Sequence, residues 1–142
     1  MICKYEYKDN ILFQIFPETL SGNDFCLLND ELKIIENKYS VVSNYVANLQ
    51  NLKSYNGKFN SIYEFAQKRI EQKSNNKILS AFLVSNDFQM GFARVFQILI
   101  DNPQISIKIF TDEAKANEWI KSEEPHSNQQ LKPPENALYS YQ

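Results

Sequence analysis

From residue 11 to residue 121, short apolar runs alternate with longer amphipathic stretches. A short apolar or β-branched run is typical of a strand, and apolar residues spaced three and four apart are typical of a helix. The alternation therefore predicts a small layered α/β domain. With 142 residues, the chain has the length of a single domain and can bury a core without disulfides or metal ions.

The first two strands are predicted to form an antiparallel hairpin. β-rich runs at residues 2–7 and 11–16 flank Asp9 and Asn10, two residue types that tolerate the left-handed backbone conformation of a tight turn. Three more strands are predicted from the apolar patterns that follow, at residues 39–49, 78–84 and 105–110. The run at 78–84 is continuously apolar, as in a central strand that is covered on both faces.

Four amphipathic helices are predicted between and after these strands, at residues 21–37, 61–73 and 88–100 and from Thr111 onward. Side chains that can bond the free amides of a first helical turn mark three of the starts. These are Asn23 and Asp24 in the first helix and Thr111 in the last. In the second helix, Ser61 and Glu64 have the spacing of a capping box. The polar residues 50–60 before it are predicted to form a loop.

The predicted order, β-β-α-β-α-β-α-β-α, implies a mixed sheet of about five strands, with the hairpin at one antiparallel edge and parallel strands elsewhere. About four helices would cover this sheet, and right-handed crossovers restrict how they are wound. The domain is expected to span residues 1–122. Residues 123–142 are polar and contain three prolines, and we expect them to form a tail outside the core.

Composition and charge give no support to catalysis, metal binding or nucleic-acid binding. The net charge is −2, whereas proteins that bind nucleic acid have a basic stripe or patch. The single histidine, His126, is in the predicted tail, and Cys3 and Cys26 lack the spacing of a metal or redox motif. We therefore expect no enzyme activity, no metal and no cofactor, and we expect both cysteines to serve as buried hydrophobic residues.

The sequence contains neither a secretory signal nor a membrane-spanning run. Its first ten residues are charged and polar, unlike the apolar core of a signal peptide. No apolar stretch approaches the roughly 20 residues that a transmembrane helix needs. A cytoplasmic protein is therefore expected.

Several local strings resemble the STAS and SpoIIAA-like family, which includes anti-sigma-factor antagonists. The opening KYEYKDNILFQI matches the position of that family's first two strands, and YVANLQNL, from Tyr45 to Leu52, is similar to its third strand. The most distinctive similarity joins GFARVF at residues 91–96 to IKIFTDEAKANEWI at 107–120. The resemblance covers residues 4–121, and it implies a single-domain SpoIIAA-like β-α superhelix that works by docking to other proteins.

In antagonists of this family, a partner kinase phosphorylates the serine of an Asp-Ser pair at the start of the second helix. This chain departs from that motif. In an alignment without a gap, the position of the Asp-Ser pair falls on Asn56-Gly57, and in one with a short insertion it falls on Asn60-Ser61. The resemblance thus makes Ser61 the candidate phosphorylation site, where helix amides and the helix dipole would favour a phosphate. An ordinary helix cap without any switch explains Ser61 equally well.

The first functional hypothesis is a non-catalytic, regulatory protein-interaction module. The resemblance implies that a protein partner, anti-sigma-factor-like or another regulator, binds the loop at residues 52–61 and the start of the next helix. The candidate contact residues are Ser54, Tyr55, Gly57, Phe59 and Ser61. Aromatic side chains are enriched at interfaces, but the alternative is that Tyr55 and Phe59 fold back onto the rim of the core. The sequence leaves a homodimer open.

The second hypothesis is a pocket for a lipid or another small apolar ligand. The SpoIIAA-like family is also described as related to lipid-binding Sec14 domains, and the phenylalanine-rich helix at 88–100 would roof such a pocket. Its candidate lining residues are Phe88, Phe92, Arg94 and Phe96. Arg94 would lie at the pocket mouth or contact an anion. Alternatively, its stem covers apolar surface while its charged end reaches water.

Overall fold

The structure is a computed structural model, and it describes residues 1–40, 42–71 and 77–123. The strands are β1 (Lys4–Lys8), β2 (Ile11–Ile15), β3 (Thr19–Ser21), β4 (Asn44–Asn48), β5 (Ser54–Asn56), β6 (Ile78–Leu83) and β7 (Ile105–Phe110). The helices are α1 (Gly22–Lys38), α2 (Phe59–Glu71), α3 (Asp87–Leu99) and α4 (Glu113–Glu123). The chain is thus an α/β domain in which strands and helices alternate.

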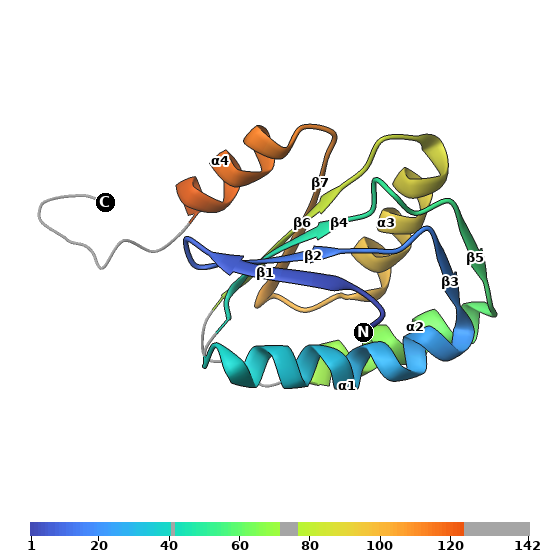
Figure 1. Cartoon of the computed structure of the whole chain (residues 1–142). Coiled ribbons are helices and arrows are strands. Elements are labelled where there is room, and N and C mark those ends of the chain that lie inside the picture. The colour runs from blue at the N-terminus through green and yellow to red at the C-terminus, as the bar shows by residue number, and fades with distance from the viewer. Residues whose placement is uncertain (41, 72–76, 124–142) are drawn as a thin grey trace, which may run out of the picture.

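Five of the strands form one mixed sheet in the order β1-β2-β4-β6-β7 (Figure 1). β1 pairs antiparallel with β2, and the remaining neighbours are parallel, with Leu12 of β2 opposite Tyr45 of β4. At the hairpin turn, Asp9 and Asn10 have φ values of 53° and 63°. The predicted mixed sheet with an antiparallel hairpin at its edge is therefore confirmed.

Helices cover both faces of the sheet unequally. α1, α2 and α3 pack against the larger core, and α4 lies on the opposite face, against β6 and β7 (Figure 1). The larger core includes Leu12, Phe25, Leu32, Phe82 and Phe96. The smaller core consists of Ile11, Val46, Leu79, Ala81, Ala116 and Ile120. β6 supplies both cores with alternate residues, which explains why its sequence is apolar at every position except Ser80.

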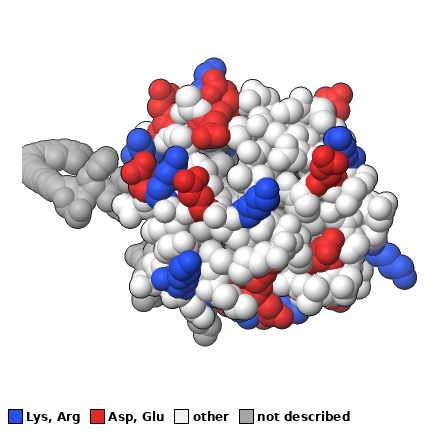
Figure 2. All heavy atoms as spheres, viewed as in Figure 1, with Lys and Arg blue, Asp and Glu red and all other residues white. Residues whose placement is uncertain are grey.

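The surface carries charges of both signs. On the face shown in Figure 2, basic and acidic side chains are interspersed, with uncharged surface between them. This face therefore has no basic patch of the kind that binds nucleic acid. Of the helices in the described part of the chain, none combines the length and apolar character needed to cross a membrane.

The sequence does not predict the two short strands β3 and β5. They pair in parallel outside the main sheet, with Thr19 opposite Ser54 and Ser21 opposite Asn56. Each has three residues, which is too few for hydrophobic periodicity to appear. The prediction of a loop is therefore wrong over residues 54–56, and the pairing brings the start of α1 beside the segment that leads into α2.

Two helices begin with caps other than those predicted. In α1 the N-cap is Ser21, which forms a capping box with Asp24, so Asn23 is not the cap. Before α4, the side chain of Asp112 accepts a backbone amide of the first turn at 2.8 Å, and this replaces the predicted cap Thr111. In both places neighbouring residues have suitable oxygens, and residue type alone does not rank them.

The second helix also begins earlier than predicted. α2 starts at Phe59, so Ser61 is its third residue rather than its cap, and the predicted capping box with Glu64 does not form. The Ser61 amide instead donates to the carbonyl oxygen of Lys58 at 3.2 Å. The capping-box pattern was present in the sequence, but the β3–β5 pairing fixes where the helix begins.

The third predicted strand is shorter than residues 39–49, because Tyr39 ends α1 as its C-cap and stacks on Tyr7 with ring centroids 4.5 Å apart. Ser40 follows with a φ of 68°, a left-handed conformation that turns the chain away from the helix. At the C-terminal end, Glu123 still belongs to α4. The predicted end of the second helix at residues 72–73 and the tail from residue 124, with His126, lie outside the described residues.

Gln89, buried at the start of α3, connects this helix to the segment between β4 and β5. Its Nε2 donates to the carbonyl oxygens of Gln50 (3.1 Å) and Leu52 (2.9 Å), and its Oε1 accepts from the Ser85 amide at 2.7 Å. We predict that Gln89→Ala lowers the free energy of unfolding by about 2–3 kcal/mol, because buried polar groups lose their partners. Gln97→Ala, on the exposed side of α3, should cost less than about 1 kcal/mol. Urea unfolding measures both, and equal losses would contradict the prediction.

Candidate functional site

The β3–β5 pair places the starts of α1 and α2 side by side. A Cβ atom on Gly57 would lie 2.6 Å from the backbone nitrogen of Gly22, and a Cβ on Gly22 would lie 3.0 Å from the Ser61 Oγ. The junction therefore requires glycine at position 57, because any side chain there would push the two helix starts apart. Ser61 is half-buried in this junction, and its phosphorylation stays a prediction.

Tyr55 packs on the rim of the core. Its hydroxyl donates to the carbonyl oxygen of Lys58 at 2.6 Å. Its ring meets the rings of Phe25 and Phe92 edge-on, with centroids 5.5 and 5.9 Å apart. Of the two alternatives for Tyr55, the structure therefore has the one in which the ring folds back onto the core. Ser54, in β5, is also half-buried.

Phe59 and Tyr63 form an exposed aromatic pair one turn apart on α2. Phe59 is 59% exposed and Tyr63 is 43% exposed, and their ring centroids are 6.5 Å apart. Neighbouring exposed rings are typical of an interaction surface. The sequence-based surface included Phe59 and the exposed Gly57 but not Tyr63. The sequence places Phe59 in the predicted loop at residues 50–60, so its four-residue helical spacing from Tyr63 becomes apparent only because α2 starts at Phe59.

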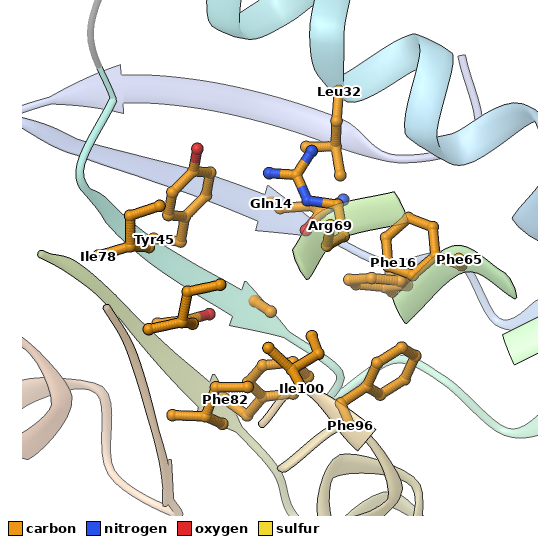
Figure 3. A pocket seen from close by; sticks show the side chains of 14 residues that line it. Gln14, Phe16, Leu32, Tyr45, Phe65, Arg69, Ile78, Phe82, Phe96 and Ile100 are labelled. Atoms are coloured by element: carbon orange, nitrogen blue, oxygen red, sulfur yellow. The ribbon is translucent and has the colours of Figure 1, made fainter. Parts of the chain in front are cut away.

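A partly open cavity of about 80 Å³ lies between the sheet and helices α2 and α3 (Figure 3). Apolar side chains form most of its lining, and Gln14, Tyr45, Ser80 and Arg69 add polar groups. In Figure 3, Gln14, Tyr45 and Arg69 lie toward one end, and Phe82, Phe96 and Ile100 lie toward the other. The cavity thus has a polar end and an apolar end.

Only one of the four predicted pocket residues lines this cavity, namely Phe96. Phe92 is buried among the rings of Phe25, Tyr55 and Phe96 and is not part of the cavity lining. Phe88 is 43% exposed and Arg94 is exposed. The cavity lies near the C-terminal end of α3, so residues in the first turns of this helix are too far from the cavity to line it. Arg94 is on the outer side of the helix.

A buried ion pair stands at the polar end of the cavity. Arg69 donates from Nη2 to Glu36 Oε2 at 2.6 Å and from Nη1 to Oε1 at 3.3 Å, and the two side chains are 13% and 14% exposed. The Tyr45 hydroxyl donates to the same carboxylate, and the Arg69 guanidinium carbon is 6.0 Å from the Tyr45 ring centroid. Glu36, Arg69 and Tyr45 therefore join α1, α2 and β4.

The protonation states of this group follow from burial and from Glu36. Burial, with the charge of Glu36, raises the pKa of Tyr45, so its hydroxyl keeps its proton and can donate. Burial acts to lower the pKa of Arg69, but the hydrogen bonds and charge of Glu36 outweigh this effect and raise it. Arg69 therefore stays charged, and Glu36 balances that charge.

Among the residues that the structure describes, neither cysteine belongs to a metal-binding cluster. Cys3 is buried, and burial raises the pKa of its thiol to about 12, which makes it unreactive near neutral pH. Cys26 is exposed, so the expectation that both are buried is wrong for Cys26. It follows the inward-facing Phe25, and successive helical side chains point in different directions. Across residues 1–40, 42–71 and 77–123, no three His, Cys, Asp or Glu side chains are grouped to hold a metal ion.

We predict that Arg69→Met lowers the free energy of unfolding by about 3–5 kcal/mol, because the largely buried Glu36 would lose the charge and both hydrogen bonds of Arg69. Adding Glu36→Gln should recover most of this loss, since neither side chain is then charged. A double-mutant cycle in urea at neutral pH measures the coupling. Lys53→Met is the control, because its pair with Glu18 is 73% and 69% exposed and should contribute less than about 1 kcal/mol. Additive losses from the two buried substitutions would contradict the ion pair.

Comparisons with known proteins bear on the fold. No family model matches the sequence, and no curated protein matches it either. Among solved structures, the chain is similar to an uncharacterized protein of the DUF3478 family with a SpoIIAA-like fold, from Shewanella loihica PV-4. The two share 14% sequence identity with a TM-score of 0.54, over 82% of this chain and 90% of that chain. At this identity the similarity concerns the fold, and the chain is an α/β protein with a SpoIIAA-like fold, as its sequence resemblance implied.

Proposed function

We propose that this protein is a non-catalytic regulatory module of the STAS type that acts in the cytoplasm by docking a partner protein. The observation that carries the proposal is the exposed aromatic pair of Phe59 and Tyr63. Aromatic side chains supply much of the binding energy at many interfaces. The SpoIIAA-like fold supports the proposal, because the family resemblance implies docking at the start of this same helix.

The aromatic pair is held ready for binding. Both rings are on a helix rather than on a loop, and the tight contact at Gly57 fixes where that helix starts. Such preorganisation reduces the entropy lost on association. The first turn of α2 has no acidic residue and follows the exposed Lys58. A complementary partner would therefore offer an apolar pocket with an acidic rim.

The double variant Phe59→Ala/Tyr63→Ala should lose the partner that the wild-type protein captures from its native host. Its circular dichroism spectrum should match that of wild type. Its free energy of unfolding should stay within about 0.5 kcal/mol of wild type, because both side chains are largely outside the core. The matched control is Leu27→Ala/Ile34→Ala on α1, whose side chains are 51% and 64% exposed. Capture by the aromatic variant at the wild-type level would contradict the proposed surface.

The cavity favours a second candidate function, the binding of a small apolar molecule. Its volume of about 80 Å³ is roughly half that of an engineered apolar cavity, about 150 Å³, that binds benzene. A lipid chain would need α2 and α3 to move apart, whereas a molecule smaller than benzene fits the space as it is. The volume therefore supports the small-ligand form of this function over the lipid form.

Native mass spectrometry of freshly purified protein tests the second candidate. We expect an additional small mass on the wild-type chain. Ala47→Leu, which would place a larger side chain in the cavity, should lose this mass because the space is then filled. Leu27→Ala, on the outer surface of α1, should keep it. An unliganded mass for wild type and both variants would set this function aside.

A further inference from the structure

Three polar groups in the cavity lining have hydrogen-bonding capacity to spare. Ser80, half-buried in β6, has a hydroxyl without a hydrogen-bond partner in the described parts of the chain. Gln14 uses its Nε2 for Cys3 and the Tyr5 hydroxyl, which leaves its carbonyl oxygen. The bonds of Arg69 to Glu36 take one N–H from each terminal nitrogen, and a guanidinium has five. A ligand would therefore meet mainly donors.

The charges at the cavity select against an ion. Among the described residues of the lining, Arg69 is the single charged one, and the carboxylate of Glu36 already balances it at 2.6 Å. An anionic ligand would be repelled by Glu36 and would find no free positive charge to pair with. A cationic ligand would be repelled by Arg69. Burying an unpaired charge is costly. An uncharged oxygen can accept from the spare donors without that cost.

We infer that this cavity binds a small uncharged molecule with an apolar body and one carbonyl or hydroxyl oxygen. The apolar body lies against Phe82, Phe96 and Ile100, and the oxygen accepts a hydrogen bond from the Ser80 hydroxyl or an Arg69 N–H. The inference rests on the second candidate function and adds the chemical class of its ligand. It is independent of the aromatic pair on α2.

The experiment is a titration of the ¹⁵N-labelled full chain, monitored by two-dimensional NMR, with three probes that have equal numbers of non-hydrogen atoms. These are acetone, isobutane and acetate, all smaller than benzene. We expect acetone to shift the amide signals of Ala47 and Ser80 saturably, and we expect the carboxylate to leave them unchanged. Saturable shifts from the carboxylate at equal affinity would overturn the charge argument.

Two serine variants test the hydrogen bond. Ser80→Ala should weaken acetone binding about fivefold, the effect of one hydrogen bond, without weakening isobutane binding. The matched control is Ser106→Ala, because Ser106 is opposite Leu79 of the smaller core and thus on the other face of the sheet. Its acetone affinity should equal that of wild type.

The outcomes separate the inference from the function on which it rests. If isobutane binds but Ser80→Ala leaves the acetone affinity unchanged, the cavity is a ligand site and the inferred hydrogen bond to Ser80 is wrong. If neither uncharged probe shifts the cavity signals, the small-ligand function fails and the inference fails with it.

Discussion

The contact on which this structure depends is the buried ion pair between Arg69 of α2 and Glu36 of α1, completed by the Tyr45 hydroxyl of β4. A buried ion pair contributes little net stability, but it allows few relative positions of the elements that carry it. Separating the two partners would leave an unpaired charge in the interior. It therefore fixes two helices against one strand of the sheet. Because Arg69 and the aromatic pair are on the same helix, the pair positions both the cavity and the proposed docking surface.

Much of the fold could be predicted from the sequence. The hairpin around Asp9-Asn10, the largely apolar β6 and the amphipathic α3 could be recognised from their patterns. Buried positions recur at every second residue of a strand and at about every turn of a helix. β3 and β5 could not be predicted in this way, because a three-residue strand outside the main sheet has no periodicity. Their pairing moves the start of α2 to Phe59, and so the capping-box prediction at Ser61 is wrong.

The functional residues were harder to predict, because the relevant contacts join distant parts of the chain. Glu36 and Arg69 are 33 positions apart, and a charged residue on an amphipathic helix gives no sign that its partner is buried beside it. Arg94 was the one charged residue among the four cavity candidates, yet it is exposed to solvent, while Arg69 lines the cavity. The sequence left open whether Phe59 and Tyr55 are exposed or fold back; Phe59 is exposed, whereas Tyr55 packs on the core.

The most direct measurement uses the arginine side-chain signals of the protein, because the chain has two arginines, Arg69 and Arg94. In a ¹H–¹⁵N spectrum near neutral pH, the Arg69 Nε–H should exchange slowly with water and show nuclear Overhauser contacts to the Tyr45 ring. The Arg94 Nε–H, on an exposed side chain, should exchange fast and provides the internal reference. Equally fast exchange of both signals, with no contact between Arg69 and Tyr45, would contradict the buried ion pair and the arrangement of α2 that depends on it.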